Sequence, residues 1–226
     1  IEQAGGSIAL GSRVISVEAE NNSFTVTIET EGEIFSLSST RLINAAGLYS
    51  SKVASLIKGL KLSLIPQTSF CKGNYFTLGG KTPFQHLIYP LPQKDGLGIH
   101  STLDLGGRTR FGPDTQWIND IGRGDIDYKV DPLRVETFKK SIALYWPDIK
   151  SRPLHPDYSG IRPKLKEPQD FILQGPKDHK IKGLVNLYGI ESPGLTAALA
   201  IGKEVSDLLS VKQKTDHHLI SMPVAP

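Results

Sequence analysis

The first sixty residues alternate between apolar and polar positions with the period of β-strands. Residues 24–29 place Phe, Val and Ile at every second position, which predicts a strand with one buried face. The pair at 31–32, Glu-Gly, predicts a turn into a second strand at 34–37. Residues 42–46 are apolar on both faces and end at Gly47, which is typical of a buried parallel strand. The chain therefore opens with a hairpin and then enters an α/β layer.

The same pattern predicts three helices. The first is short, with Ser50 and Ser51 as candidate capping residues, and ends near Gly59. The second begins at Pro132, a residue favoured in the first turn of a helix. The third runs from about 194 to 209. Its first half is apolar on every side, so we expect that half to be buried. The second helix has one apolar face, formed by Val135, Phe138, Ile142 and Tyr145.

Between the first two helices, residues 62–113 predict strands separated by glycine turns. Gly106 and Gly107 predict a hairpin turn between strands at 103–105 and 108–111. A polar loop is predicted at 118–131. Extended structure returns at 158–165, 171–173 and 184–187, and residues 210–226 read as a loose tail. We therefore expect β/α structure at both ends of the chain, an antiparallel β-rich insert between them, and a ligand between the two lobes.

Composition narrows the class of partner. The chain has 226 residues, a net charge of +3 and scattered lysines, so nucleic acid is not an expected partner. No apolar run approaches the roughly 20 residues that cross a membrane. Cys71 is the only cysteine, so no disulfide forms within the chain, and a reducing, cytoplasmic location is expected. The histidines lack the spacing of metal ligands.

Seven short motifs occur in an order that resembles a known family. Together they are similar to the D-amino-acid-oxidase-like flavoenzymes, and within them to the L-2-hydroxyglutarate oxidase/dehydrogenase branch, over about residues 5–209. The motifs are Asn44-Ala45-Ala46-Gly47-Leu48-Tyr49, Lys72-Gly73-Asn74-Tyr75-Phe76, Ile88-Tyr89-Pro90-Leu91-Pro92, Gly98-Ile99-His100, Phe111-Gly112-Pro113, Gly160-Ile161-Arg162-Pro163 and Ser192-Pro193-Gly194-Leu195-Thr196.

The resemblance implies an α/β (mixed α+β) fold: part of an FAD-binding Rossmann-like domain with an antiparallel β-rich substrate domain. Residues 1–60 then form the second part of the FAD-binding domain and 61–150 the substrate-binding domain. Residues 151–209 return to the FAD-binding domain, and 210–226 form the tail. The family's G-x-G-x-x-G, which holds the FAD pyrophosphate, has no counterpart in this sequence. We therefore expect weak FAD binding by this chain alone, with the missing segment lost by truncation or supplied in trans.

For the cofactor FAD, the resemblance implies two contact regions. The strand of Val14 lies on the adenine side, and the Ala46-Gly47 turn passes close to the cofactor. The loop from Gly189 to Thr196 borders the isoalloxazine, where amides at a helix start suit negative charge. The implied cofactor-binding residues are Val14, Ala46, Gly47, Gly189, Ser192, Gly194, Leu195 and Thr196.

His100 is the candidate catalytic base. In a strand it shares a face with Gly98, Thr102 and Asp104, so its ring should look into a polar space. An imidazole is suited to accept a hydroxyl proton near neutral pH while a hydride leaves the substrate carbon. A hydrogen-bonded structural histidine is the alternative.

The candidate substrate-binding residues are Arg162, Lys72 and Tyr75. The family's corresponding arginine holds the substrate carboxylate, which the guanidinium of Arg162 matches with two donors; a structural salt bridge is the alternative. Lys72 and Tyr75 are expected to engage a second carboxylate or to orient the first. Tyr89 is equally well explained as core packing, and Cys71 as a small buried residue.

The leading hypothesis is the C-terminal portion of an FAD-dependent oxidoreductase that oxidises a small 2-hydroxy acid such as L-2-hydroxyglutarate. An amino-acid or secondary-amine oxidase of the same fold is the second hypothesis, because amine chemistry needs no hydroxyl base. The third is a non-catalytic fragment that docks onto a partner carrying the pyrophosphate-binding segment.

Overall fold

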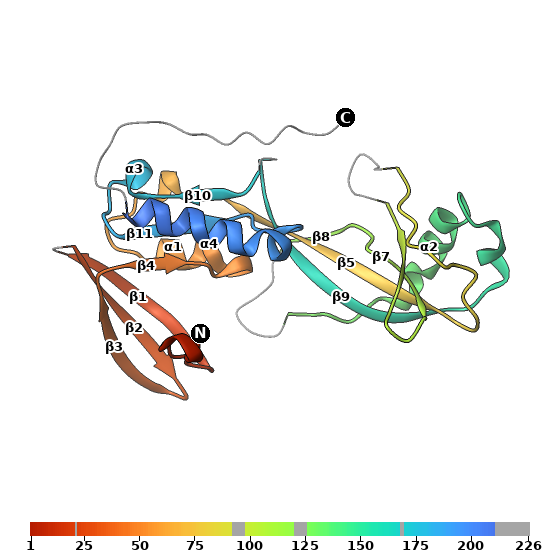
Figure 1. Ribbon diagram of the computed structural model, residues 1–226, viewed down its shortest axis with the longest axis horizontal. Coiled ribbons are helices and arrows are strands. Elements are labelled where there is room, and N and C mark those ends of the chain that lie inside the picture. Colours follow the sequence, from red (N-terminus) through yellow and green to blue (C-terminus); the bar gives the residue numbers. More distant parts are fainter. Residues whose placement is uncertain (21, 92–97, 120–125, 168–169, 211–226) are drawn as a thin grey trace.

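The computed structural model describes residues 1–20, 22–91, 98–119, 126–167 and 170–210. Figure 1 shows an α/β layer and a β-rich lobe, connected by two long strands that run side by side, β5 (Thr68–Leu78) and β9 (Leu154–Leu165). Mixed α and β structure with antiparallel sheets confirms the predicted fold class. Short 3-10 helices lie at Glu2–Ala4, Gly47–Tyr49, Leu62–Leu64, Pro132–Arg134 and Pro147–Ser151.

The predicted hairpin is part of a three-stranded antiparallel sheet. Its strands are β1 (Ser12–Glu20), β2 (Ser23–Thr30) and β3 (Glu33–Ser39), in that order. The apolar positions of β2 are buried as the alternation predicts, in a core that includes Phe24 and Ala54.

The α/β layer contains a sheet of order β10-β11-β4, from β4 (Leu42–Asn44), β10 (Ile172–Gln174) and β11 (Leu184–Tyr188). β4 and β11 are parallel, as the sequence predicts. The prediction that both faces of β4 are buried is wrong, because Ile43 is half exposed. The helices of the layer are α1 (Ser50–Ser55), α3 (Pro176–His179) and α4 (Gly194–Ser210).

Two predictions about the helices of this layer are wrong. Neither Ser50 nor Ser51 caps α1: the N-cap is Tyr49, Ser50 is buried, and the Ser51 hydroxyl binds the carbonyl of Pro66. The apolar first half of α4 is exposed, and Leu195 and Leu199 are more than nine-tenths accessible. An apolar helix is buried only where other elements cover it, and no described residue covers this side of α4.

The β-rich lobe is built on β5, which pairs with β7, β8 and β9. The other strands are β6 (His100–Leu103), β7 (Thr109–Gly112) and β8 (Gln116–Ile118). The turn between β6 and β7 follows the predicted hairpin, and the predicted helix after Pro132 is α2 (Val135–Ile142), whose Phe138 and Ile142 are fully buried.

The long strand β9 begins shortly after the predicted domain boundary at residue 151. It pairs with β5 along its whole length, and its last residue, Leu165, is buried in the same core as Leu184 and Tyr188 of the α/β layer. Most of the predicted tail, and residues 120–125 of the predicted loop, lie outside the described residues. None of the described helices is long and apolar enough to span a membrane.

Candidate functional site

One face of the β-rich sheet carries three of the predicted site residues. Arg162 lies opposite Cys71, and His100 lies opposite Gly112, in antiparallel pairs whose side chains share a face. Gly112 in turn lies beside the ring of Tyr75. Because alternate residues of a strand point to the same side, His100, Tyr75 and Arg162 face the same space. We call this surface the substrate face.

Arg162 is held on the substrate face without a carboxylate partner among the described residues. Its Nη2 donates to the backbone oxygen of Asp114 at 2.9 Å and to the Sγ of Cys71 at 3.3 Å. The Asp114 carboxylate itself binds Arg134 and Asn74. The structural salt bridge considered for Arg162 is therefore absent from the described part of the chain, and its positive charge can serve an external anion.

Two glycines make room for the side chains of the substrate face. A Cβ at Gly73 would lie 3.4 Å from the Nη2 of Arg162 and 2.7 Å from Pro113. A Cβ at Gly112, where φ is +146°, would lie 2.6 Å from the Tyr75 ring. These close contacts explain the glycines of the motifs that contain Tyr75 and Phe111.

His100 is buried beneath an exposed tyrosine. The ring of Tyr89 lies over the imidazole with centroids 4.0 Å apart, and Tyr89 is 61% exposed. Ile99 packs into the core on the opposite side of the strand, so His100 points away from that core. The interpretation of Tyr89 as core packing is wrong, because its aromatic ring covers His100 from the solvent side.

Lys72 does not join the substrate face. It points to the other side of β5, where it is buried, and its Nζ donates to the backbone oxygens of Asp127 and Lys129 at 2.7 and 2.6 Å. These bonds fix the segment that precedes α2. The expectation that Lys72 binds a substrate carboxylate is therefore corrected, because alternation along β5 points its side chain to the face opposite that of Tyr75.

The turn at Ala46 and Gly47 is fixed by a chain of buried amides. The Asn44 side chain donates to the Ser50 backbone oxygen at 2.8 Å and to the Asn186 side chain at 3.0 Å, and accepts from the Ala46 amide at 3.3 Å. Gly47 has φ +55° and no atom within 4 Å of an added Cβ. The turn thus leaves open space beside its backbone, which suits the close approach of a cofactor.

The glycines of the loop before α4 have close internal neighbours, unlike Gly47. A Cβ at Gly194 would meet Ile190 at 2.6 Å, and one at Gly189 would meet Leu165 at 2.9 Å. These glycines permit close internal packing, and the cofactor-binding role that the resemblance implies for Gly194 stays a prediction. Ser192 makes no capping hydrogen bond among the described residues. The first amides of α4, at Leu195 and Thr196, have no acceptor within the helix and lie at an exposed end.

An ion pair joins the substrate face to this loop. Lys164 lies two residues beyond Arg162 on the same face of β9, and its Nζ binds the Glu191 carboxylate at 2.7 Å. The start of α4 is therefore placed beside the end of the substrate face (Figure 1). Val14, the remaining predicted cofactor residue, is half buried on β1 and packs against the core that includes Leu165 and Tyr188.

Tyr158 is a site residue that the sequence analysis missed. Its ring stacks on Tyr75 with centroids 4.4 Å apart. Its position in the sequence offered a signal, because Tyr158, Gly160, Arg162 and Lys164 follow one another at every second residue. No group of three or more metal-binding side chains lies together among the described residues.

Comparison with known proteins places the chain in a family. Residues 1–208 match the family described as FAD dependent oxidoreductase. The chain therefore belongs to the FAD-dependent oxidoreductases of this family, as the motifs predict. It is 45% identical over 177 residues to the mitochondrial L-2-hydroxyglutarate dehydrogenase of Arabidopsis thaliana, a match that covers 74% of this chain and 37% of that protein.

Two further similarities differ in what they show. Glycerol 3-phosphate dehydrogenase of Caloramator mitchellensis is 29% identical over 210 residues, which are 91% of this chain and 40% of that protein. The dithionite-reduced L-α-glycerophosphate oxidase of Mycoplasma pneumoniae with FAD bound matches with a TM-score of 0.75 at 23% identity, over 93% of this chain and 53% of that one. The latter shows the fold alone. The chain spans about half, or less, of the length of these proteins.

Proposed function

We propose that this chain is the substrate-binding portion of an FAD-dependent oxidoreductase that oxidises a small 2-hydroxy acid, with L-2-hydroxyglutarate as the first candidate. The observation that carries the proposal is Arg162. Its guanidinium faces the same space as His100 and Tyr75 and has no carboxylate partner among the described residues. A partly buried cation without a counter-ion favours an anionic ligand, and the planar guanidinium matches a carboxylate.

The residues of the substrate face support oxidation of a hydroxyl group. With the carboxylate on Arg162, the neighbouring carbon would carry its hydroxyl toward His100. The neutral imidazole would accept the hydroxyl proton as the C–H bond breaks, so that the 2-hydroxy acid becomes a 2-oxo acid. The Tyr89 ring, which lies over His100, would keep water from the imidazole.

The described residues fit FAD at two places. The open backbone at Gly47 permits close approach, and the exposed amides of Leu195 and Thr196 suit an electron-rich edge. When bound, FAD would accept the hydride that leaves the substrate carbon. Lys164 and Glu191 would hold these amides beside the substrate face.

The test is a panel of substrates applied without oxygen to this chain loaded with FAD in the presence of a nucleotide-binding segment (the FAD-loaded protein), with loss of flavin absorbance as the signal. We expect reduction by L-2-hydroxyglutarate. Reduction by amino acids alone would favour the amine oxidase, and reduction by glycerol 3-phosphate alone would favour the activity named for the Caloramator mitchellensis relative. Either result would overturn the 2-hydroxy acid proposal.

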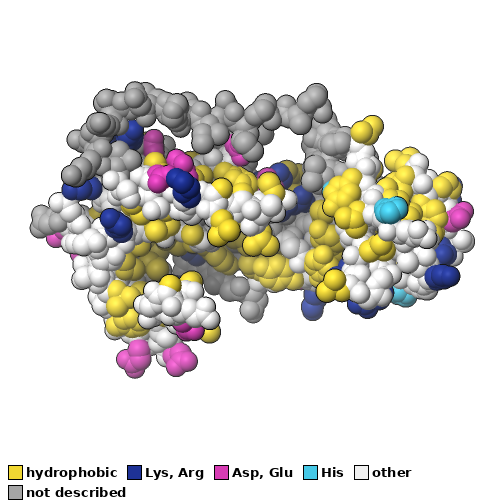
Figure 2. Space-filling view, in the orientation of Figure 1, with side chains coloured by type: hydrophobic (Ala, Val, Ile, Leu, Met, Phe, Trp, Pro, Cys, Tyr) yellow, Lys and Arg dark blue, Asp and Glu magenta, His cyan; other side chains and the backbone are white. Residues whose placement is uncertain are grey.

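We also propose that the exposed apolar side of α4 binds a nucleotide-binding segment, within a longer chain or in trans. A groove of about 380 Å³ lies here, lined by Ile43, Leu187, Ala198 and Gly202 among others. β4 is the last strand of its sheet, so its free edge can pair with a further parallel strand. Figure 2 shows hydrophobic side chains exposed along this part of the molecule.

This second proposal is tested by co-expression with a strand–turn–helix segment that carries G-x-G-x-x-G. We expect yellow protein from the pair and little flavin on this chain alone. Leu199→Arg should prevent the association, whereas Glu204→Arg, on the polar side of the same helix, should permit it. Equal flavin content with and without the added segment would contradict the proposal.

A further inference from the structure

β5 and β9 contain a β-bulge beside the substrate face. Their pairing shifts between Asn74 and Phe76, so Tyr75 lies opposite two residues of β9, Asp157 and Tyr158. Bulges re-aim side chains and are frequent next to binding sites. This bulge brings the rings of Tyr75 and Tyr158 into a stack, with planes 15° from parallel.

The Tyr75 ring is held from both sides. On one side is Tyr158, and on the other is the backbone of Gly112, so close that a Cβ there would lie 2.6 Å from the ring. Burial and then the neighbouring Tyr158 raise the pKa of Tyr75 to about 12, against an opposing effect of Arg162. The phenol therefore stays protonated near neutral pH, and its hydroxyl is a hydrogen-bond donor within the electrostatic range of Arg162.

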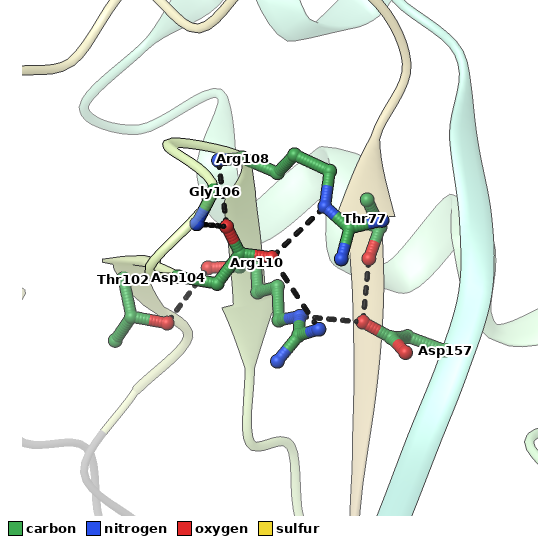
Figure 3. A network of polar contacts seen from close by, with 7 residues as sticks. All are labelled: Thr77, Thr102, Asp104, Gly106, Arg108, Arg110 and Asp157. Carbon is green, nitrogen blue, oxygen red and sulfur yellow. Dashed lines mark hydrogen bonds and ion pairs between the residues drawn. The ribbon is translucent and has the colours of Figure 1, made fainter.

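Tyr158 is itself held by a network of charges. The guanidinium of Arg110 lies 5.5 Å from the centre of the Tyr158 ring. Figure 3 shows that Arg110 also pairs with Asp157 and Asp104, at 2.9 and 3.5 Å. Thr77 donates a further hydrogen bond to Asp157 at 2.5 Å. Since Arg110 is neutralised by two aspartates, its contact with Tyr158 serves to hold the ring in place rather than to bind a substrate anion.

We propose that Tyr158 is a positioning residue: it clamps Tyr75 against Gly112, so that the Tyr75 hydroxyl donates a hydrogen bond to the carboxylate held by Arg162. This inference rests on the proposed function. It assigns to Tyr158 no contact with the reacting atoms. Its effect is therefore on the affinity for the carboxylate and is exerted through Tyr75.

The test measures binding of glutarate, which lacks the 2-hydroxyl group and cannot be oxidised in the same way, to the FAD-loaded protein by calorimetry. We expect Tyr158→Leu to weaken glutarate about threefold to tenfold, the range for an aromatic pair. Tyr158→Phe keeps the ring and should bind like the wild type. Tyr128→Leu is the matched control, because Tyr128 is 48% exposed and Tyr158 is 47% exposed.

A double variant separates positioning from direct contact. In a Tyr75→Phe background, Tyr158→Leu should cause no further loss, because its effect passes through the Tyr75 hydroxyl. Additive losses, or an unchanged affinity in Tyr158→Leu with an unchanged thermal midpoint, would overturn the inference.

A second variant is available if Tyr158→Leu fails to fold. Arg110→Met removes the cation beside the Tyr158 ring and so loosens that ring indirectly. A glutarate affinity equal to that of the wild type in Arg110→Met would also overturn the inference. Failure of the wild type to bind glutarate while hydroxy acids still reduce the flavin would overturn this inference alone; failure of both would overturn the proposed function.

Discussion

Lys164 and Glu191 form an ion pair, with 2.7 Å between Nζ and Oε1, that connects the substrate face to the loop before α4. Lys164 lies near the end of β9, and Glu191 lies in the loop that leads into α4. Their side chains are 31% and 24% exposed, so the pair is screened by solvent. Its value is therefore in the placement of two regions rather than in stability.

We expect a double-mutant cycle with Lys164→Met and Glu191→Gln to give a coupling energy of roughly 0.2–1 kcal/mol, measured by urea unfolding. The coupling should shrink as salt is added, because exposed charges are screened. The exposed pair Lys203–Asp207 on α4 is a matched control for a pair within one helix. A coupling that does not respond to salt would mean that packing, rather than charge, joins these residues.

Asn186 is expected to be essential for the stability of the α/β layer. It is fully buried, accepts from Asn44 at 3.0 Å and donates to Gln174 at 3.4 Å. Asn186→Leu removes both bonds and leaves two buried polar groups without a hydrogen-bond partner. At about 1–3 kcal/mol for each group, it should cost about 2–6 kcal/mol of unfolding free energy. Chemical denaturation measures this, with the exposed Asn119→Leu as control. A loss below that of the control would show that the amide chain is dispensable.

His179 is expected to make stability depend on pH. Burial is the main cause that lowers the pKa of this imidazole, against the opposing charge of Asp178. The unfolded chain therefore binds a proton more readily than the folded chain. The contribution is fully present above the unfolded pKa of roughly 6.5 and is lost as the pH falls from there toward the folded pKa.

The check for His179 is urea unfolding of the wild type and His179→Asn between about pH 5 and 8. An asparagine oxygen can replace the Nδ1 acceptor that binds the Ile181 amide. We expect the variant to lose less stability on acidification than the wild type, and His86→Asn, at an exposed histidine, to match the wild type. Parallel curves for all three proteins would remove His179 as a cause.

The alternation of the sequence was sufficient to predict which side chains of β2 are buried and that Ile99 and His100 point to opposite sides, because both depend on local periodicity. It could not predict the stack of Tyr75 on Tyr158. That contact depends on a bulge between strands more than seventy residues apart, and periodicity does not fix such a register. The motif grouped Lys72 with Tyr75, although residues three positions apart in a strand point to opposite faces. The apolar pattern also predicted burial of Leu195 and Leu199, since an apolar helix does not reveal which of its sides will be covered.

Arg162→Met tests the carboxylate-binding site. The variant keeps much of the apolar volume but removes the charge. Binding of the 2-hydroxy acid, measured as the concentration that half-saturates flavin reduction, should therefore weaken by roughly 2–4 kcal/mol. Stability should fall by only about 1 kcal/mol, the worth of the bond to the Asp114 carbonyl. A loss of about 3–5 kcal/mol in stability with unaltered half-saturation would instead be the behaviour of a buried structural ion pair.

The most direct test of the proposed 2-hydroxy acid oxidation is the rate of anaerobic flavin reduction by L-2-hydroxyglutarate in the FAD-loaded wild type and in His100→Ala. We expect reduction in the wild type and a rate about 10²- to 10⁴-fold lower in the variant, with the same flavin content, because a general base is typically worth that much. His86→Ala should reduce at the wild-type rate. Equal rates in wild type and His100→Ala, or no reduction of the wild type by any 2-hydroxy acid, would contradict the proposed oxidation.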